Sequence, residues 1–360
     1  MTKGYDILAI VPFEQIPVID ITPAMGARPE AGFAGHFTDV CHEVGFALVT
    51  GHGVDSQLVD DVFAMMHRFF ALPDEQKRLV DKNASPQMRG WEPVGAETTN
   101  NRPDLREQID VWTAHPVADD PALPVYHRLH GPNQWLPEDV LAGHCELSER
   151  WIAALANVAD HLMATLAVGL GLDPDHFRRL FGQRTMSLAK FIHYPPTPNG
   201  GAGVNPHHDA GFVTVLAPGP TPGLQVQNPE GDWIDVPIVE DAFVINLGEN
   251  FQAMTGNYLV ATPHRVVTAE ERWSAGYFHG PSLDTPLAPL DLAPSFAAAV
   301  TASPRHRSAG FMPTPEEAGA GTEAMASAHR PSTYGEQLWN YFNRSYADAM
   351  RHHHGAVLEN

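Results

Sequence analysis

The chain changes its hydrophobic period once, near residue 186, and this change most constrains its fold. Residues 137–171 repeat apolar side chains every three to four positions, which predicts a long amphipathic helix. From Met186 the period is two, and short strands are predicted over residues 186–192, 212–217, 223–227, 233–236, 242–247, 264–268 and 274–279. Helices followed by short antiparallel strands predict an α+β chain with a β-sandwich or jelly-roll core.

Shorter elements flank these two regions. Strands are predicted at residues 16–20 and 46–50, helices at 33–46 and 56–70, and a last helix from Tyr334 to about Arg351. Residues 82–106 are predicted to form a loop or irregular ribbon, and residues 282–331 are rich in proline, alanine, glycine and serine. We interpret the chain as one domain, 1–360, in which 1–115 closes the core, 186–281 forms the jelly roll and 282–360 adds a loop and helix.

Composition narrows the classes of partner. The 43 acidic residues outnumber the 22 basic ones, for a formal charge of −21, which argues against nucleic acid or an anionic membrane as the main partner. Two cysteines in 360 residues indicate reduced thiols rather than a disulfide framework. We read no signal peptide and no run of 18 apolar residues. We therefore expect a cytoplasmic protein that acts on a small molecule, as a monomer or alternatively a dimer.

Two histidines and one aspartate are spaced as ligands of a facial-triad metal site. His207 and Asp209 are two residues apart, so they project to the same side of an extended strand. His208 projects to the other side and is not counted as a ligand, and His264 must come from another strand. Two imidazoles and one carboxylate hold one face of Fe(II) and leave positions open for O2 and a substrate. The pattern predicts an O2-activating iron rather than a structural ion.

A His-x-Asp pair alone is a weak signal, because the chain has 20 histidines. The surrounding residues strengthen it. Arg272 and Ser274 are again two apart, and a guanidinium beside a hydroxyl can bind one carboxylate. Tyr194 ends a predicted strand and could be a third donor to that carboxylate. Alone, Arg272 could form a surface salt bridge and Tyr194 could be a core residue, but with the triad they predict a carboxylate clamp.

Ten segments occur in an order that is unlikely to arise by chance. They are Pro17-Val18-Ile19-Asp20, Val44-Gly45-Phe46, Gly51-His52-Gly53-Val54, Phe69-Phe70-Ala71-Leu72-Pro73, His193-Tyr194-Pro195-Pro196, His207-His208-Asp209-Ala210-Gly211, Gly223-Leu224-Gln225-Val226, Phe243-Val244-Ile245-Asn246-Leu247-Gly248, His264-Arg265-Val266 and Arg272-Trp273-Ser274. In this order they resemble the motifs of the isopenicillin N synthase-like Fe(II)/2-oxoglutarate-dependent oxygenases. That family includes plant soluble dioxygenases, ACC oxidase and the bacterial ethylene-forming enzyme.

The resemblance implies a distorted double-stranded β-helix, a jelly roll, with flanking helices. It implies that His207, Asp209 and His264 bind iron and that Arg272 and Ser274, assisted by Tyr194, hold the distal carboxylate of 2-oxoglutarate. Asn246 lies where the family often has a polar residue near the cofactor. The implied reaction oxidises a C–H bond of a small molecule with O2 and releases succinate and CO2.

Two alternatives remain open at this stage. Isopenicillin N synthase uses an Arg-x-Ser clamp for its substrate, and ACC oxidase uses no 2-oxoglutarate, so the chain could be a 2-oxoglutarate-independent Fe(II) oxidase or cyclase. A non-catalytic jelly-roll binding protein is the second alternative, and the intact triad argues against it. The composition, poor in lysine and rich in alanine and proline, is typical of a high-GC bacterium. It favours secondary metabolism, antibiotic biosynthesis included.

The ribbon at residues 86–110 is the predicted substrate region. It contains Arg89, Glu92 and Glu97 and resembles a ribbon over the active-site mouth of the family. In the ethylene-forming enzyme, an acidic residue of the similar run binds a guanidinium substrate. We therefore predict that Glu97 or Glu92 binds a cationic substrate such as an amino acid, with solvated ribbon residues as the alternative reading.

Overall fold

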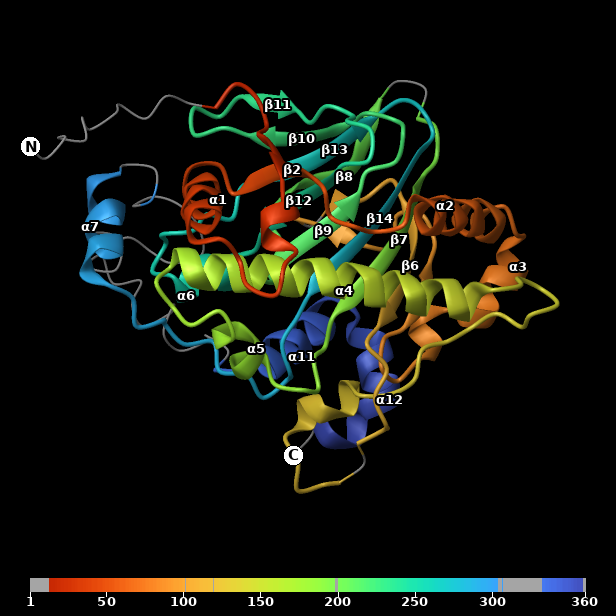
Figure 1. Ribbon diagram of the computed structural model, residues 1–360. Helices are drawn as coiled ribbons and strands as arrows, with labels where there is room; N and C mark the ends of the chain where they lie inside the picture. Colours follow the sequence, from red (N-terminus) through yellow and green to blue (C-terminus); the bar gives the residue numbers. More distant parts are fainter. Residues whose placement is uncertain are drawn as a thin grey trace, which may run out of the picture.

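The computed structural model describes residues 13–100, 102–118, 120–197, 200–303, 306 and 332–358. Two sheets lie face to face, with helices on the outer side of the larger sheet (Figure 1). In spatial order, the large sheet contains β1 (Val18–Asp20), β2 (Phe46–Thr50), β12 (Phe243–Leu247), β9 (Val213–Ala217), β14 (Arg272–His279), β7 (Leu188–Tyr194), β6 (Glu107–Trp112) and β3 (Gly90–Glu92). The small sheet contains β11 (Trp233–Asp235), β10 (Leu224–Gln227), β13 (His264–Thr268) and β8 (Gly201–His207). The predicted jelly roll with flanking helices is confirmed.

The outer face of the large sheet is covered by α4 (His144–Gly169), which crosses the strands beside α1 (Ala31–Glu43) and α2 (Ser56–Phe70) (Figure 1). Apolar residues three to four apart turn one stripe of α4 towards the sheet, among them Trp151, Leu155 and Leu162. By length and composition alone α4 could cross a membrane. Its apolar stripe is instead buried in the main core, as expected for the core helix of a globular domain.

A second core fills part of the space between the two sheets. Its members are Phe46, Leu48 and Val244 of the large sheet and Val204, Leu224, Val226 and Val266 of the small sheet, with other apolar residues. On β7 the strand alternation sends Phe191 to the helix side, whereas Ile192 and Tyr194 point between the sheets. The inner face of the large sheet is therefore apolar at one end, and polar side chains can line the opposite end.

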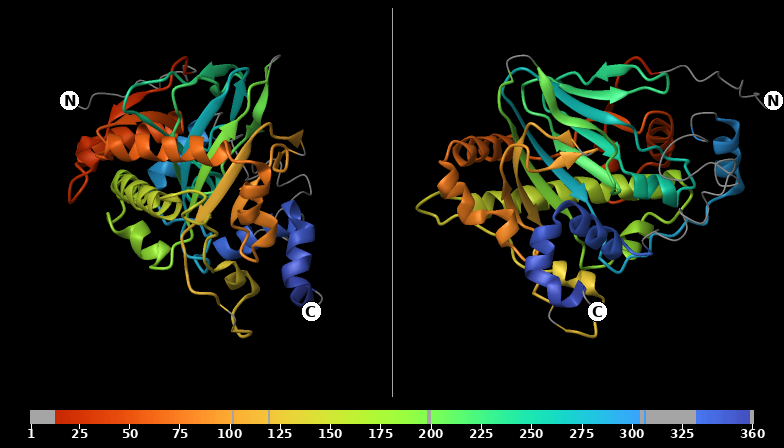
Figure 2. Two further views of the ribbon diagram at one scale, coloured as in Figure 1. Left: turned by 90° about the vertical axis from the view of Figure 1, so that its right-hand side faces the viewer. Right: turned by 180° about the vertical axis from the view of Figure 1, so that it is seen from behind.

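The last two helices close the polar end of the molecule. The predicted single helix from Tyr334 is two helices, α11 (Tyr334–Ser345) and α12 (Ala347–Leu358), which break at Tyr346 (Figure 2). On α11, Gln337 exchanges two amide hydrogen bonds of 2.6 and 2.9 Å with Asn250 of α6 (Glu249–Met254). The helix thereby docks next to the chain segment that follows β12.

Several predicted boundaries differ from the structure. The helix predicted to reach residue 46 ends at Glu43, because Gly45 turns the chain with φ +68 and a side chain there would meet the Val260 carbonyl oxygen. The predicted ribbon contains β3 and the hairpin β4 (Thr98–Thr99) and β5 (Arg102–Pro103). The other described α-helices are α3 (Asp74–Lys77), α5 (His176–Phe181) and α7 (Pro294–Ala302). Of the proline- and alanine-rich stretch, residues 304–305 and 307–331 lie outside the described residues.

Candidate active site

The three predicted metal ligands meet at the mouth between the sheets. His207 ends β8, His264 begins β13, and antiparallel pairing places these two residues opposite one another. Asp209 follows two residues after His207, with its Oδ1 atom 3.7 Å from His207 Nε2 and 3.6 Å from His264 Nε2. One ligand atom from each residue lies within 4.8 Å of the others. The three side chains can therefore hold one metal ion, as the spacing predicts.

Backbone carbonyls set the orientation of both imidazoles. His207 Nδ1 lies 2.9 Å from the Asn205 carbonyl oxygen, and His264 Nδ1 lies 3.1 Å from that of Thr262. A ring that donates from Nδ1 leaves the lone pair of Nε2 free for a metal. Burial, together with the neighbouring His264, lowers the pKa of His207 to about 3. His207 is therefore in the neutral form that metal binding requires.

Asp209 is oriented by two hydrogen bonds to one of its oxygens. Its Oδ2 atom accepts from Thr214 Oγ1 at 2.6 Å and from Asn246 Nδ2 at 2.7 Å, while Oδ1 faces the imidazoles. Burial alone would raise the pKa of this carboxyl, but the two imidazoles and the two hydrogen bonds together hold it below its ordinary value. The sequence assigned Asn246 to cofactor binding. In the structure Asn246 contacts the metal ligand Asp209, because β12 and β9 bring Asn246 opposite Thr214, and its contact with a cofactor stays a prediction.

His208 lies outside the triad, as expected from strand alternation. Its Nδ1 atom is 3.7 Å from Glu249 Oε1. Burial, and secondarily the charge of Asp209, raises the pKa of Glu249 to about 7. This acidic side chain beside the metal ligands carried no signal in the sequence, because α6, on which it lies, was not predicted.

The predicted clamp forms deep between the sheets. Arg272 and Ser274 alternate along β14 on the inner face, and Tyr194 of β7 pairs directly with Arg272. The Arg272 guanidinium lies 5.0 Å from the centre of the Tyr194 ring. Burial lowers the pKa of Arg272, and a hydrogen bond with Tyr194 opposes that shift. The three predicted residues are thus brought together.

The clamp has unused hydrogen-bonding capacity. Arg272 Nε and Nη1 and Ser274 Oγ are buried and have no hydrogen-bond partner among the residues that the structure describes. Buried donors without acceptors are costly, so such a group is explained best by a ligand that supplies the acceptors. The distal carboxylate of 2-oxoglutarate has the charge and the oxygens to do so. The residues present therefore fit this co-substrate.

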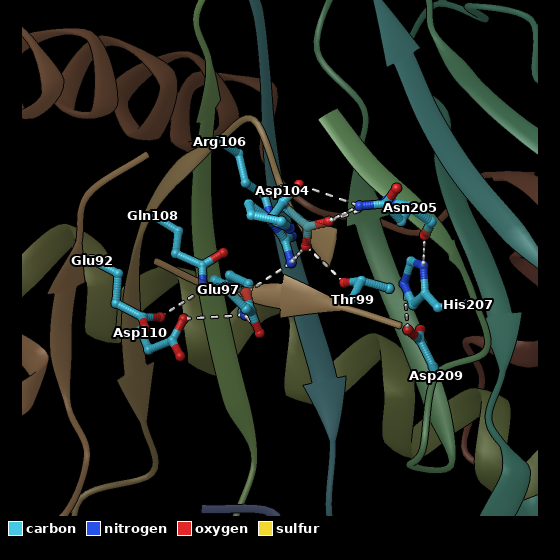
Figure 3. Close-up of polar contacts among 12 residues, drawn as sticks. Glu92, Glu97, Thr99, Asp104, Arg106, Gln108, Asp110, Asn205, His207 and Asp209 are labelled. Carbon is cyan, nitrogen blue, oxygen red and sulfur yellow. Dashed lines mark hydrogen bonds and ion pairs between the residues drawn. The ribbon is translucent and has the colours of Figure 1, made fainter. Parts of the chain in front are cut away.

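A buried set of charged and polar side chains, here the inner polar network, covers the far end of the inner face. It consists of Lys82, Glu92, Glu97, Asp104, Arg106, Gln108, Asp110, Lys190, Tyr341 and Tyr346. Figure 3 follows part of it from Glu92 through Glu97 and Asp104 towards His207. Sequence reasoning missed most of these residues. The alternating polar positions of Glu107–Trp112 were the available signal, and β6 there puts Gln108 and Asp110 on the inner face.

The two acidic residues predicted to bind a cationic substrate already have partners in the chain. Glu92 accepts from Lys82 Nζ at 2.8 Å, and Glu97 accepts from Arg106 at 2.7 Å and from Lys190 at 3.0 Å. Burial alone would raise the pKa of Glu97, but these cations hold it well below its ordinary value. A cationic substrate would have to displace a lysine or an arginine of the chain. We therefore do not assign Glu92 or Glu97 that role.

Arg89 is also a structural residue. Its guanidinium is buried and donates to the backbone carbonyls of Gln87 and Leu129 at 2.6 and 2.8 Å. It lies 5.2 Å from the Trp112 ring, within a group of side chains that includes Met186. These contacts fix the loop before β3 and leave the predicted substrate role of Arg89 without support.

Comparisons with known proteins agree with this site. A family model described as the N-terminal region of non-haem dioxygenases in morphine synthesis matches residues 16–138, and one for the 2OG-Fe(II) oxygenase superfamily matches residues 184–281. The 2-oxoglutarate-dependent dioxygenase frbJ of Dothideomycetidae sp. (strain 11243) is 32% identical over 296 residues, 79% of each chain. Kihadalactone A synthase of Citrus sinensis is 31% identical over 286 residues, 75% of this chain and 84% of its own.

Solved structures share the fold. A full-length protein of Neurospora crassa, solved in complex with alpha-KG, aligns with a TM-score of 0.67 at 23% identity and covers 84% of this chain and 94% of that one. The chain belongs to the 2OG-Fe(II) oxygenase superfamily. It is a 2-oxoglutarate-dependent dioxygenase, an oxidoreductase whose cofactors are Fe(II), 2-oxoglutarate and O2.

Proposed function

We propose that this enzyme oxidises an unactivated C–H bond of a small molecule, an amino acid or a natural-product intermediate, with succinate and CO2 as co-products. In this proposal His207, Asp209 and His264 bind the iron, and Arg272, Ser274 and Tyr194 bind 2-oxoglutarate. The observation that carries the assignment is the set of buried, unpartnered donors on Arg272 and Ser274, on the inner face that also leads to the triad.

Each group of residues has a distinct task. Bound Fe(II) and 2-oxoglutarate supply the oxidising chemistry that protein side chains lack. Asp209 and the two imidazoles would hold the metal through three ligand atoms, which would leave positions for the co-substrate and O2. The clamp fixes one end of the co-substrate, which orients its reactive end towards the metal. The second core between the sheets limits the water that reaches the site.

Co-substrate binding and turnover test this assignment. The wild type should bind 2-oxoglutarate in the presence of Fe(II) under anaerobic conditions and should release succinate in air. Ser274→Ala should weaken 2-oxoglutarate binding without loss of metal, because it removes one clamp donor only. Release of succinate with unchanged 2-oxoglutarate affinity in Ser274→Ala would contradict the clamp assignment. No release of succinate with any substrate would contradict the proposed reaction.

The 2-oxoglutarate-independent oxidase is not supported as the function, because the 32% identical relative is a 2-oxoglutarate-dependent dioxygenase and the clamp residues fit 2-oxoglutarate. The name of the Citrus sinensis relative, a synthase of kihadalactone A, supports a natural-product intermediate as the substrate class. A panel of amino acids and natural-product precursors, scored by substrate-dependent succinate release, tests this choice. Stimulation by neither class would reject both.

A further inference from the structure

The hairpin β4–β5 lies against β8 immediately before the first metal ligand (Figure 3). Asn100 Nδ2 at its tip donates to the Pro206 carbonyl oxygen at 2.5 Å. Leu105 donates its backbone N–H to the Ala202 carbonyl oxygen at 3.2 Å. The hairpin is thus bonded to the strand that ends at His207.

Asp104 is the buried link between this hairpin and the strand. Only 1% of the residue is exposed, and its carboxylate receives four donors. Oδ2 accepts from Thr99 Oγ1 at 2.7 Å and from Arg106 at 3.3 Å. Oδ1 accepts from the backbone N–H and the side-chain Nδ2 of Asn205, at 3.1 and 3.0 Å. A buried carboxylate with this many donors is held in one position.

Asn205 carries this constraint to the metal ligand. Its N–H and side chain are bound by Asp104, and its carbonyl oxygen accepts from His207 Nδ1 at 2.9 Å. The backbone of Asn205 is therefore held at both its N–H and its carbonyl group. Groups that orient a ligand imidazole tune the affinity of the metal site, and their loss usually lowers that affinity about 10- to 100-fold.

We propose that Asp104 is a positioning residue for the iron ligand His207 and acts through Asn205. This inference rests on the proposed iron site. Asp104 also connects the metal ligand to the rest of the inner polar network, because Arg106 binds both Asp104 and Glu97. The second imidazole, His264, is oriented by the backbone carbonyl of an uncharged residue. The Thr262 carbonyl that orients His264 belongs to a residue whose hydroxyl donates to the Val44 carbonyl at 2.5 Å.

Metal binding without co-substrate or turnover tests the proposal. Co(II) is titrated into the metal-free wild type and into Asp104→Ala, and both affinity and the visible absorption of bound Co(II) are recorded. Asp104→Ala should weaken Co(II) binding on the order of 10- to 100-fold. Its Co(II) spectrum should also change, because the His207 ring is no longer held in one orientation. A merely structural residue would leave the spectrum of the bound metal as it is in the wild type.

Two further variants make the result decisive. Glu92→Gln removes a carboxylate of the same network, one that is also 1% exposed and bound to a cation, but it does not touch Asn205. It should bind Co(II) as the wild type does. Asn205→Ala keeps the backbone bond to Asp104 and loses the side-chain bond. It should show a smaller loss than Asp104→Ala and decides the question if Asp104→Ala does not fold.

Wild-type affinity and spectrum in Asp104→Ala, or in Asn205→Ala where only that variant folds, would overturn the positioning role. An equal loss in Glu92→Gln would also overturn it, because the effect would then belong to the network as a whole. Failure of the wild type itself to bind Co(II) would instead reject the iron site on which the inference rests.

Discussion

The two faces of the large sheet differ in chemistry although they belong to the same strands. On β14, Trp273, Ala275 and Tyr277 point to the outer side and join the core beneath α4, whereas Arg272 and Ser274 point inward. The outer face is apolar and carries the packing that stabilises the fold. The inner face is apolar at one end, and at the other it carries buried polar groups, among which Arg272 and Ser274 have donors left for a ligand. Substitutions on the two faces should therefore separate function from stability.

The largest effect is expected for a metal ligand on the inner side. His207→Ala should abolish succinate release, because only two of three iron ligands remain. The free energy of unfolding of the metal-free protein should fall by about 1 kcal/mol or less, since one hydrogen bond is lost. Activity assays and chemical denaturation with a chelator present measure the two quantities. Full activity in the variant would contradict the assignment of function to the inner face.

A large substitution on the outer side should do the reverse. Trp151 of α4 is fully buried and packs edge-on against Phe243 of β12. Trp151→Ala should lower the free energy of unfolding by about 3–5 kcal/mol, because it leaves a cavity. At a temperature where the variant is folded, its KM for 2-oxoglutarate should equal that of the wild type. A raised KM with unchanged stability would mean that the two faces are not independent.

Arg272 sharpens the comparison, because its loss should affect the two properties in opposite directions. Arg272→Met should raise the Kd for 2-oxoglutarate on the order of 10²-fold, since charge-assisted hydrogen bonds are lost. The same change removes a buried charge without a carboxylate partner among the described residues, so the Tm of the protein without co-substrate should stay equal or rise. A calorimetric titration and a thermal melt measure the two. A fall in Tm would show that Arg272 supports the fold.

The smallest effect concerns pH and the helix side of the sheet. His144 at the start of α4 accepts a hydrogen bond at Nδ1 from the Leu136 N–H, and burial lowers the pKa of His144 to about 4. Because this pKa is lower in the folded than in the unfolded chain, His144 adds stability above pH 6.5. That stability is lost as the pH falls from 6.5 to about 4.

At pH 5.5 the loss should be about 1.4 kcal/mol, one pKa unit of difference. Denaturant unfolding at pH 7.5 and 5.5 measures the total loss of stability, and His144→Gln should lose about 1.4 kcal/mol less than the wild type over that interval. His279 at the end of β14, whose pKa burial also lowers to about 4, contributes in the same direction and remains in the variant as an internal reference. An unchanged pH slope in His144→Gln would show that this imidazole is not the source.

Much of the fold and the metal site could be predicted because both depend on local spacing. The period of two predicted most strands of the core. The two-residue spacing predicted that Arg272 and Ser274 share a face of β14 and that His207 and Asp209 reach one metal site. Tyr194 was placed correctly beside Arg272 because the motif marked the end of its strand.

What the sequence could not provide was the pairing of residues far apart. In the sequence Glu92 looks like an unpaired acid in a polar ribbon, but in the structure Lys82 and Gln108 donate hydrogen bonds to its carboxylate. The contact of Asn246 with Asp209 depends on the register of β12 against β9, which no local pattern encodes. Strand β6 was not predicted, because polar side chains alternate along it and look solvent-exposed in the sequence. In the structure Asp110 of β6 is buried and paired with Lys82 and Lys190, which come from other segments.

The docking of α11 has a consequence for biosynthesis. A ribosome makes the chain from the N-terminus, so all three metal ligands and the clamp exist once residue 274 has been added. Gln337 and Tyr341, which bind Asn250 and Glu97, follow more than sixty residues later. At the usual pace of about 5–20 residues per second, several seconds separate the two events. During that interval the nascent chain already contains every metal ligand but still lacks the helix that bonds to Asn250 and Glu97.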